Sequence, residues 1–110
     1  GGIDLDLAIP RSLGGSGKGH NPEQLLAAGH ASCFLMVMQD IAQKRGRLAD
    51  IEGVVIHAEA ILGTPTDRPG WGFQVNLKVE GVEQELIDAT DEACPFSRME
   101  KEGIVLNVTK

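Results

Sequence analysis

The stretch Asn21–Phe34, which reads NPEQLLAAGHASCF, predicts the start of a long central helix. Asn21 is a preferred N-cap residue, and Pro22 suits the first helical position because it has no N–H to leave unpaired. Gln24, three residues after the cap, can complete a capping box with Asn21. Helical sequence continues to about Arg45, where a glycine supplies the stop. We therefore expect one helix to run from the capping box to about Arg45.

The middle of this predicted helix is apolar all round. From Ala31 to Met38 every residue except Ser32 is apolar. A helix of this kind must be enclosed on all sides, and a 110-residue chain cannot easily enclose it alone. The pattern therefore predicts a helix buried at a subunit interface of an obligate oligomer.

Outside this helix, apolar and polar residues mostly alternate, which is the period of two typical of strands. The segments with this pattern are 3–9, 54–62, 71–80 and 104–109, and a turn-rich loop at 63–70 predicts that the middle two form an antiparallel hairpin. A second amphipathic helix is predicted at 82–93. It ends at Cys94, because a residue before proline is pushed out of helical conformation, and a short turn or helix follows to Glu102. The sequence predicts an α+β fold in a single domain, residues 1–110.

The composition argues against several partners and compartments. The formal net charge is −6 and no cluster of Lys or Arg occurs, whereas nucleic acid and anionic membrane surfaces require a basic face. No stretch approaches the roughly 20 apolar residues of a membrane span, and no secretory signal is present. Two widely spaced cysteines fit a reducing compartment better than a secreted disulfide scaffold. We therefore expect a cytoplasmic protein without nucleic-acid or membrane partners.

The two cysteines are the residues most able to do chemistry. Cys33 lies inside the apolar helix directly before Phe34, and Cys94 lies at a helix end, two residues before Phe96. The aromatic rings would give each thiol an apolar wall suited to an apolar substrate. The thiols are either inert core residues or a redox pair, in which a sulfenic acid formed by peroxide condenses with the second thiol. Because burial raises a thiol pKa, a reactive Cys33 needs a cation or hydrogen-bond donors nearby.

Other candidate groups are less well placed. Glu23 is the nearest acid on the same helix, but ten residues of helix span about 15 Å, too far for direct contact with Cys33. Glu23 could orient an arginine that bridges the gap, or the helix could bend near Gly29. The histidines show no metal-ligand spacing, the glycine-rich loop 14–19 lacks the ending of a P-loop, and no Gly-x-Ser-x-Gly elbow supports a hydrolase. We therefore expect no metal site, phosphate cradle or hydrolase triad.

Two segments resemble the signatures of the OsmC/Ohr family of peroxidases. Asn21–Phe34 closely resembles the first signature, and Cys94–Ser97, which reads CPFS, resembles the second. Residues 104–108 stand where the family has its closing strand. The segment from Leu7 through Gly15 looks more like the organic hydroperoxide resistance (Ohr) branch than the OsmC branch. The resemblance covers nearly the whole chain and favours a redox pair over inert thiols.

The resemblance implies an OsmC/Ohr-like fold, with antiparallel sheets wrapped around central helices in an intertwined homodimer. It implies a cysteine-based peroxidase that reduces organic hydroperoxides, including those of fatty acids, to alcohols. By the same resemblance Cys33 is the peroxidatic residue, Cys94 the resolving residue, and Glu23 the acid that holds a catalytic arginine. Phe34 and Phe96 are the candidate substrate-pocket residues. The implied reductant is a dithiol, typically a lipoylated protein, and no metal or other cofactor is expected.

The family's catalytic arginine has no counterpart in the printed sequence. In the family it lies on an N-terminal hairpin that precedes the position of Ile3. The sequence opens Gly1-Gly2 without a Met, so we expect a segment that carries this arginine to come before it. Arg11 matches a surface position of the family, and Arg98 lies after the second signature. A protein that began at Gly1 would leave Cys33 without its activating cation.

Two alternative functions stay open at this point. One is an OsmC-type, osmotically induced peroxidase with overlapping chemistry and a broader tolerance of peroxides. The other is a non-catalytic dimeric module that binds a lipid or another apolar ligand in the same pocket. The pair of thiols distinguishes the peroxidases from the binding module, because only the peroxidases need it.

Overall fold

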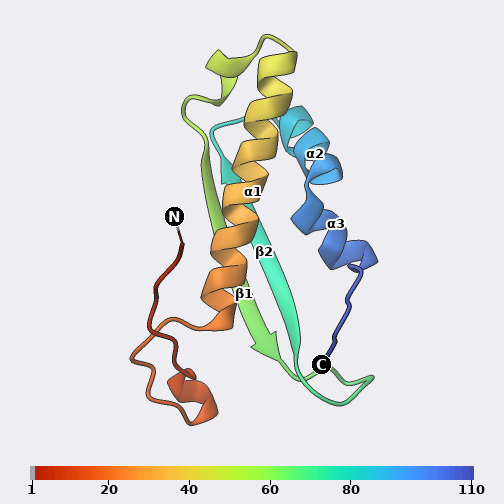
Figure 1. Ribbon diagram of the computed structural model, residues 1–110. Helices are drawn as coiled ribbons and strands as arrows, with labels where there is room; N and C mark the ends of the chain where they lie inside the picture. Colours follow the sequence, from red (N-terminus) through yellow and green to blue (C-terminus); the bar gives the residue numbers. More distant parts are fainter. Residues whose placement is uncertain (1) are drawn as a thin grey trace. The chain divides into compact units, whose positions relative to one another are not determined.

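The computed structural model describes residues 2–110 and has an α+β architecture, which confirms the predicted class (Figure 1). In chain order the elements are η1 (Arg11–Leu13), α1 (Pro22–Lys44), η2 (Leu48–Ile51), β1 (Val55–Gly63), β2 (Gly72–Glu80), α2 (Gln84–Ala93) and α3 (Pro95–Glu102). The chain divides into two compact units. The first unit holds the N-terminal residues to Ala28 with Ala58–Asn76, and the second unit holds Gly29–His57 with Leu77–Lys110. A single domain of residues 1–110 stays a prediction.

Helix α1 begins at the predicted capping box. Asn21 Oδ1 accepts a hydrogen bond from the Gln24 N–H at 2.9 Å, and Gln24 Oε1 accepts one from the Asn21 N–H at 3.1 Å. These reciprocal bonds satisfy two backbone donors that the first turn would otherwise leave unpaired. At the other end Gly46 has a φ of 67°, in the left-handed region that favours glycine. The predicted helix is confirmed, and it ends at Lys44.

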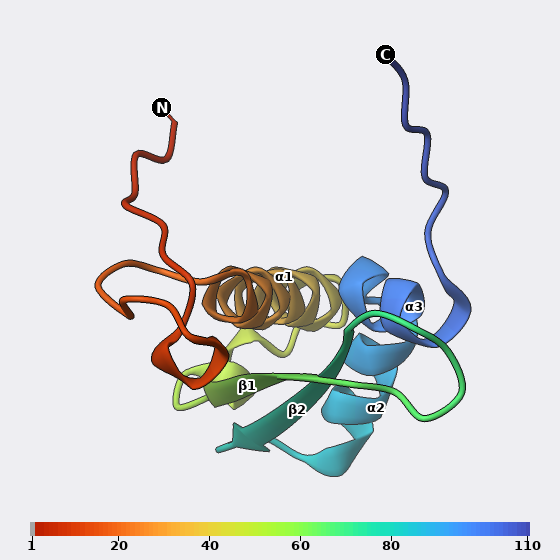
Figure 2. The same cartoon turned by 90° about the horizontal axis from the view of Figure 1, so that it is seen from below.

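Strands β1 and β2 form the predicted antiparallel hairpin, and each begins one residue later than the alternation indicated. Figure 2 shows them as a twisted pair of neighbouring strands. Along β1 the residues are alternately exposed and half-buried, and Ile56 and Ala58 belong to the half-buried set. One face of the hairpin is therefore apolar, as the period of two predicts.

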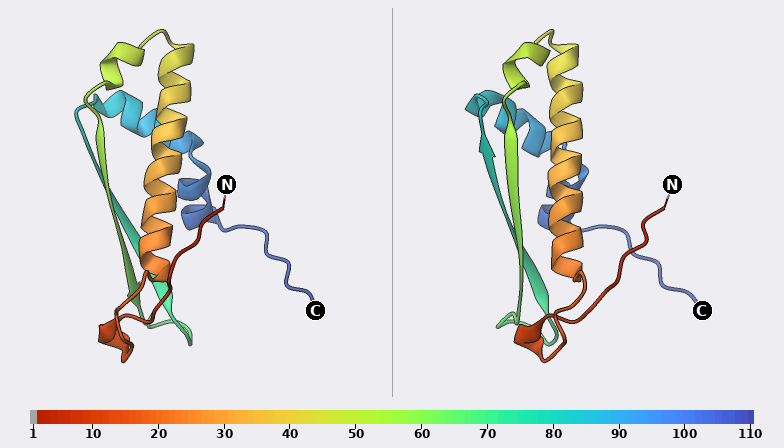
Figure 3. Two further views of the ribbon diagram at one scale, coloured as in Figure 1. Left: turned by 60° about the vertical axis from the view of Figure 1, so that its left-hand side comes forward. Right: turned by 90° about the vertical axis from the view of Figure 1, so that its left-hand side faces the viewer.

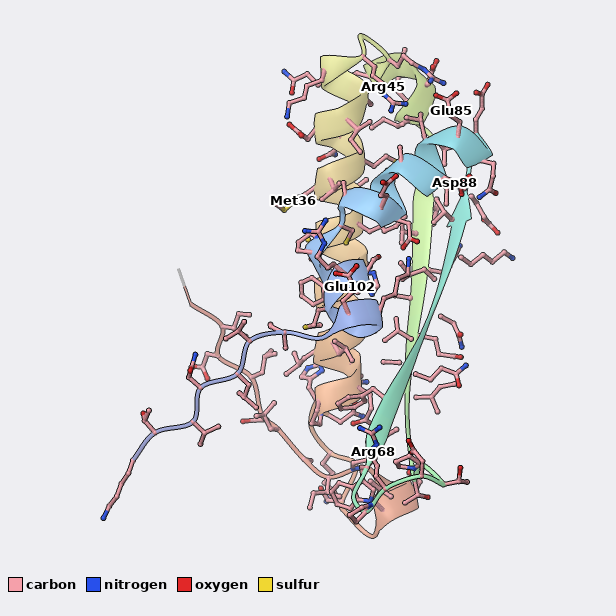
Figure 4. The ribbon with its side chains drawn as sticks, turned by 90° about the vertical axis from the view of Figure 1, so that its right-hand side faces the viewer. Met36, Arg45, Arg68, Glu85, Asp88 and Glu102 are labelled. Carbon is pink, nitrogen blue, oxygen red and sulfur yellow. The ribbon has the colours of Figure 1, made fainter. Side chains whose placement is uncertain are left out.

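The core of the second unit lies along one row of α1. Every fourth residue of that row is buried, namely His30, Phe34, Met38 and Ala42. The last three belong to one apolar cluster with Ile51, Leu86 and Cys94. An exposed ion pair between Arg45 Nη1 and Glu85 Oε1, 3.1 Å apart, also joins the turn that follows α1 to α2 (Figure 4). The position of Cys94 in this cluster links the core to the candidate chemistry.

The two terminal segments correct the predicted strands at 3–9 and 104–109. In the first unit the alternating residues make one isolated bridge between Leu7 and His20, and Ile3 is 83% exposed. In the second unit the chain leaves α3 as an extended segment, and Val105 is 86% exposed (Figure 3). A strand needs a partner for its backbone N–H and C=O groups, and within the described residues neither segment has a paired strand.

Helix α1 also corrects the expectation that no stretch is apolar enough to cross a membrane. By length and composition alone it could do so. A core helix of a folded protein passes the same test. Because α1 buries Phe34, Met38 and Ala42 in the cluster of the second unit, we interpret it as a core helix.

Candidate active site

The structure brings Cys33 and Cys94 into the core of the same unit. Cys94 is fully buried, whereas Cys33 is half-buried and packs against the cluster that contains Cys94. Both are free thiols. The two residues come from distant parts of the sequence, since one lies within α1 and the other between α2 and α3. Their proximity is the first requirement of a redox pair.

The environment of Cys33 raises the pKa of its thiol. Burial has the largest effect, followed by electrostatic repulsion between Cys33 and Cys94 as thiolates and a side-chain hydrogen bond between the two residues. A hydrogen bond from the backbone of Phe96 acts in the opposite direction, because it stabilises the thiolate. None of the groups that shift this pKa within residues 2–110 is a cation. The described chain therefore supplies one hydrogen-bond donor to Cys33 but not the cation that an activated thiolate needs.

Cys94 is the junction between two helices. It ends α2, where its N–H donates to the carbonyl of Thr90 at 2.8 Å, and it caps α3, where its carbonyl accepts from the Arg98 N–H at 3.0 Å. Its backbone is extended because Pro95 follows, as predicted from the sequence. Pro95 then starts α3 and leaves the N–H of Phe96 free for a partner outside the helix.

The two aromatic residues beside the thiols have different surroundings. Phe34 is only 2% exposed and lies in the core cluster. Phe96 is half-buried, packs against that cluster, and lies over Gly29, one helical turn before Cys33. Phe96 is therefore the better placed of the two to contact a substrate at Cys33, and the pocket role of both residues stays a prediction.

His30 is the residue that sequence reasoning missed. It was considered only as a metal ligand, yet its side chain is buried among groups from α3. Its Nε2 lies 3.1 Å from Ser97 Oγ, and its Nδ1 lies 2.7 Å from Glu100 Oε2. The second contact has the distance of an ion pair, but Nδ1 has no hydrogen-bond partner among the described residues. The sequence did carry a signal for the burial of His30. It lies four residues before Phe34 and eight before Met38, on the same face of the helix.

A second polar contact of Ser97 is with Asp91 of α2. Lys101 holds the pKa of Asp91 below its ordinary value, and hydrogen bonding to Ser97 and the charge of His30 lower it further. Lys101 and Asp91 form an ion pair. Polar side chains from all three helices of the second unit therefore meet around Ser97.

Glu23 lies in the first unit, at the edge of an apolar cavity of about 560 Å³. The cavity lining includes Leu13, Trp71 and Phe73. Glu23 Oε1 is buried and has no hydrogen-bond partner among the residues the structure describes. A buried carboxylate oxygen without a partner is costly, so this position favours an additional donor or cation.

The two arginines considered from the sequence have other partners. In the first unit, Arg11 Nε donates a hydrogen bond to the carbonyl of Ser16 at 3.1 Å. In the second unit, Arg98 Nε lies 4.0 Å from Glu102 Oε2. Within residues 2–110, neither makes the contact that the resemblance implies for a catalytic arginine. No group of three His, Cys, Asp or Glu side chains in that range could hold a metal ion.

The chain belongs to the OsmC-like family, whose model, described as OsmC-like protein, matches residues 15–109. The organic hydroperoxide resistance protein of Xanthomonas axonopodis pv. citri is 33% identical over 114 residues, which cover 97% of this chain and 78% of that protein. This confirms the family resemblance seen in the two cysteine segments.

Two solved structures are similar to this fold. An organic hydroperoxide resistance protein from Legionella pneumophila matches with a TM-score of 0.78 and 34% identity, over 92% of this chain and 76% of that one. OhrB of Bacillus subtilis, also an organic hydroperoxide resistance protein, matches with a TM-score of 0.75 and 29% identity, over 91% and 76%. Both neighbours are named organic hydroperoxide resistance proteins, and the name of the Legionella protein also contains OsmC.

Proposed function

We propose that this protein is a thiol-dependent peroxidase that reduces organic hydroperoxides, including those of fatty acids, to alcohols. The observation that carries the proposal is the meeting of Cys33 and Cys94 in one apolar core, close enough for Cys94 to affect the pKa of Cys33. The relatives named for organic hydroperoxide resistance support it. The acidic chain, with no basic cluster, favours an uncharged or apolar peroxide over a polyanionic substrate.

The proposed reaction has two chemical steps. The Cys33 thiolate attacks the terminal oxygen of the hydroperoxide, the O–O bond breaks, and the alkoxide takes a proton to leave as an alcohol. Cys33 is thereby oxidised to a sulfenic acid. The Cys94 thiol then attacks that sulfur, a disulfide forms, and the sulfenic oxygen leaves as water.

An external dithiol closes the cycle. It reduces the Cys33–Cys94 disulfide to two thiols and is itself oxidised to a disulfide, so two electrons enter for each peroxide reduced. We propose a lipoylated protein as this partner, on the basis of the family resemblance. A cytoplasmic location agrees with a cycle that needs a reducing compartment.

Glu23 would contribute to catalysis through a cation. Within residues 2–110 its buried Oε1 lacks a hydrogen-bond partner, and no cation is among the groups that shift the pKa of Cys33. We propose that an arginine from outside residues 2–110 pairs with Glu23 and lowers the pKa of Cys33. One guanidinium can donate to a carboxylate and still present a positive charge to a thiolate.

We further propose that the active unit is a homodimer. Met36 lies in the middle of the apolar segment of α1, is 66% exposed, and points away from the core of the second unit (Figure 4). A second copy packed on this side of α1 would remove its side chain from water. The intertwined arrangement comes from the resemblance.

The test uses the Cys33→Ser and Cys94→Ser variants with cumene hydroperoxide and hydrogen peroxide. The wild-type protein, given one equivalent of cumene hydroperoxide, should lose two hydrogens in an intact-mass measurement and yield a Cys33–Cys94 peptide on digestion. Cys33→Ser should lose all peroxide consumption. Cys94→Ser should consume one equivalent and then stop with a sulfenic acid at Cys33. Peroxide reduction that persists in Cys33→Ser would remove this residue from the mechanism.

The comparison of substrates separates the Ohr-type from the OsmC-type peroxidase. An Ohr-type enzyme should turn over cumene hydroperoxide with a much higher kcat/KM than hydrogen peroxide. Similar kcat/KM values on both would favour the OsmC-type alternative.

A second candidate function is a non-catalytic module that binds an apolar ligand. The observation that favours it is the cavity beside Trp71 and Phe73, whose volume suits a small ligand. Binding of a fatty acid that quenches Trp71 fluorescence, together with no consumption of any hydroperoxide, would support this function and exclude the peroxidase.

A further inference from the structure

We propose that His30 is a positioning residue that ties α3 to α1 and so holds Cys94 and the Phe96 N–H beside the sulfur of Cys33. The effect on peroxide turnover rests on the proposed function. The effect on the geometry of the two thiols does not, and it can be measured without peroxide.

The contacts of His30 join two helices. The side chain comes from α1 and is 3% exposed, and both polar partners, Ser97 and Glu100, come from α3. A buried imidazole without partners would be costly, so these contacts oppose any movement of α3 away from α1. The hydrogen-bonding contact is the one between Nε2 and Ser97 Oγ at 3.1 Å, while Nδ1 lies 2.7 Å from Glu100 Oε2 without a hydrogen bond among the described residues.

Aromatic packing restrains the same ring. The centroid of Phe96 lies 5.7 Å from that of His30, and the centroid of Phe34 lies 6.3 Å from it. Such distances lie in the range of favourable ring pairs. Phe96 therefore contacts His30 through its side chain while its backbone contacts Cys33.

The short sequence between the contacts transmits the restraint to the thiols. Cys94, Phe96 and Ser97 lie within four consecutive residues, at the cap and in the first turn of α3. Each residue of a helix adds only about 1.5 Å along its axis, so Ser97 cannot move far while Phe96 stays in place. Loss of the hydrogen bond between His30 and Ser97 would therefore make two groups less well positioned. They are the Phe96 N–H that donates to Cys33 and the Cys94 thiol that must attack the sulfur of Cys33.

The order Ser97–His30–Glu100 also resembles the serine, histidine and acid of a hydrolase triad. Two observations favour positioning over acyl transfer. Ser97 is only 3% exposed, and its hydroxyl also hydrogen-bonds Asp91, which stabilises the ionised carboxylate. A nucleophile must be reachable by an acyl substrate, and this hydroxyl is surrounded by its own helices.

The experiment compares disulfide closure in the wild-type chain with that in His30→Gln, His30→Ala and Ser97→Ala. Glutamine keeps an amide that can reach Ser97, whereas alanine removes both contacts. The control is His57→Gln, a histidine with a 55% exposed side chain that pairs with Glu80 across the hairpin. Circular dichroism and urea unfolding identify the variants that stay folded.

In the first arm the Cys33–Cys94 disulfide is formed with diamide. This oxidant takes two electrons and two protons from the two thiols and becomes a hydrazine. A separate arm uses cumene hydroperoxide with dimedone present, which traps the Cys33 sulfenic acid before Cys94 reaches it. We expect His30→Ala and Ser97→Ala to close about 10-fold to 100-fold more slowly than wild type, the size of effect that a displacement of about 1 Å produces. His30→Gln should lie between, and His57→Gln should match wild type.

The positioning role would be overturned if His30→Gln and Ser97→Ala each folded and each formed the Cys33–Cys94 disulfide at the wild-type rate. This result would hold even if His30→Ala failed to fold. Normal diamide closure with no reaction toward peroxide, in a wild-type protein that carries the proposed arginine, would instead overturn the proposed function, and the diamide arm would still decide the role of His30. Hydrolysis of p-nitrophenyl acetate by a Cys33→Ser/Cys94→Ser double variant that Ser97→Ala abolishes would overturn positioning in favour of acyl transfer.

Discussion

The ring of Phe96 occupies the space that a side chain at Gly29 would need. A Cβ built on Gly29 would lie 3.1 Å from Cζ of Phe96 and 3.2 Å from Cε1. These distances are shorter than ordinary van der Waals contact, so glycine at this position lets the first turn of α3 approach α1. The approach occurs one helical turn before Cys33, on the element that carries the proposed peroxidatic thiol.

The substitution Gly29→Ala should separate stability from reactivity. Alanine favours a helix over glycine by about 1 kcal/mol, and the displaced ring offsets this, so the free energy of unfolding should change by less than about 1 kcal/mol. Closure of the Cys33–Cys94 disulfide by diamide should nevertheless slow, because the ring and the Phe96 N–H move together. Gln43→Ala, an exposed change further along the same helix, is the control and should alter neither quantity. Unchanged closure in Gly29→Ala would show that the approach of Phe96 does not matter to the thiols.

The substitution Glu23→Gln should stabilise the 110-residue chain. Its buried Oε1 has no hydrogen-bond partner among residues 2–110, and a neutral amide costs less to bury than an unpaired carboxylate, so the free energy of unfolding should rise by about 1 kcal/mol. Urea denaturation measures the change. Glu52→Gln, at an exposed position, should have no effect beyond error. A destabilised Glu23→Gln would mean that the carboxylate already has a cationic partner in this chain.

The substitution Met36→Glu should weaken self-association. A carboxylate on the exposed apolar side of α1 would have to lose its water in the proposed dimer, whereas in the separate chain it stays hydrated. Sedimentation velocity over a concentration series should show a shift from dimer toward monomer. Gln84→Glu adds the same charge at an exposed position of α2 and should leave the association unchanged. A dimer of equal strength in Met36→Glu would place the interface elsewhere.

The substitution Lys101→Met should reduce stability in a way that depends on pH. Lys101 lowers the pKa of Asp91 from its ordinary value of 3.8, so the ion pair stabilises the fold at pH values above that range. The stabilisation disappears as the pH falls through the lowered pKa, because the carboxyl is then protonated in the folded state as well. Urea unfolding should therefore show a small difference between wild type and Lys101→Met at neutral pH that vanishes in acid. Lys110→Met is the control, and a difference that persisted in acid would contradict the assignment to Asp91.

Local signals in the sequence were sufficient for the helices and the hairpin. The bonds between Asn21 and Gln24 depend on residues three apart, and the break at Cys94 depends on the proline that follows it. Both features act within one helical turn, so they can be predicted without knowledge of the rest of the fold. The same holds for β1 and β2, because the loop between them is short and rich in turn residues.

The terminal segments show where local pattern fails. The alternation in 3–9 and 104–109 indicates which face of a strand would be apolar, but it does not supply a partner for the backbone. Ile3 and Val105 are mostly exposed in the structure, and neither segment belongs to the sheet formed by β1 and β2. Strand formation depends on pairing at long range, which periodicity does not encode.

The candidate site likewise has residues that local sequence identifies and contacts that depend on the rest of the fold. The two thiols could be named from the sequence because each lies in a recognisable segment, and the half-buried position of Phe96 beside Cys33 agrees with the expectation of an apolar wall. The contact of His30 with Ser97 crosses 67 residues, and no spacing rule connects them. Its burial could have been anticipated from the helical row that it shares with Phe34, but its partners could not.

The exposed end of the chain has a practical consequence for work with the protein. Ile104, Val105, Leu106 and Val108 are each more than 70% exposed and lie on the extended segment that follows α3 (Figure 3). Such a run is a template on which identical segments of other molecules can stack edge to edge. The yield of refolding should therefore fall as the protein concentration rises. The substitution Val105→Lys should make this yield depend less on the protein concentration.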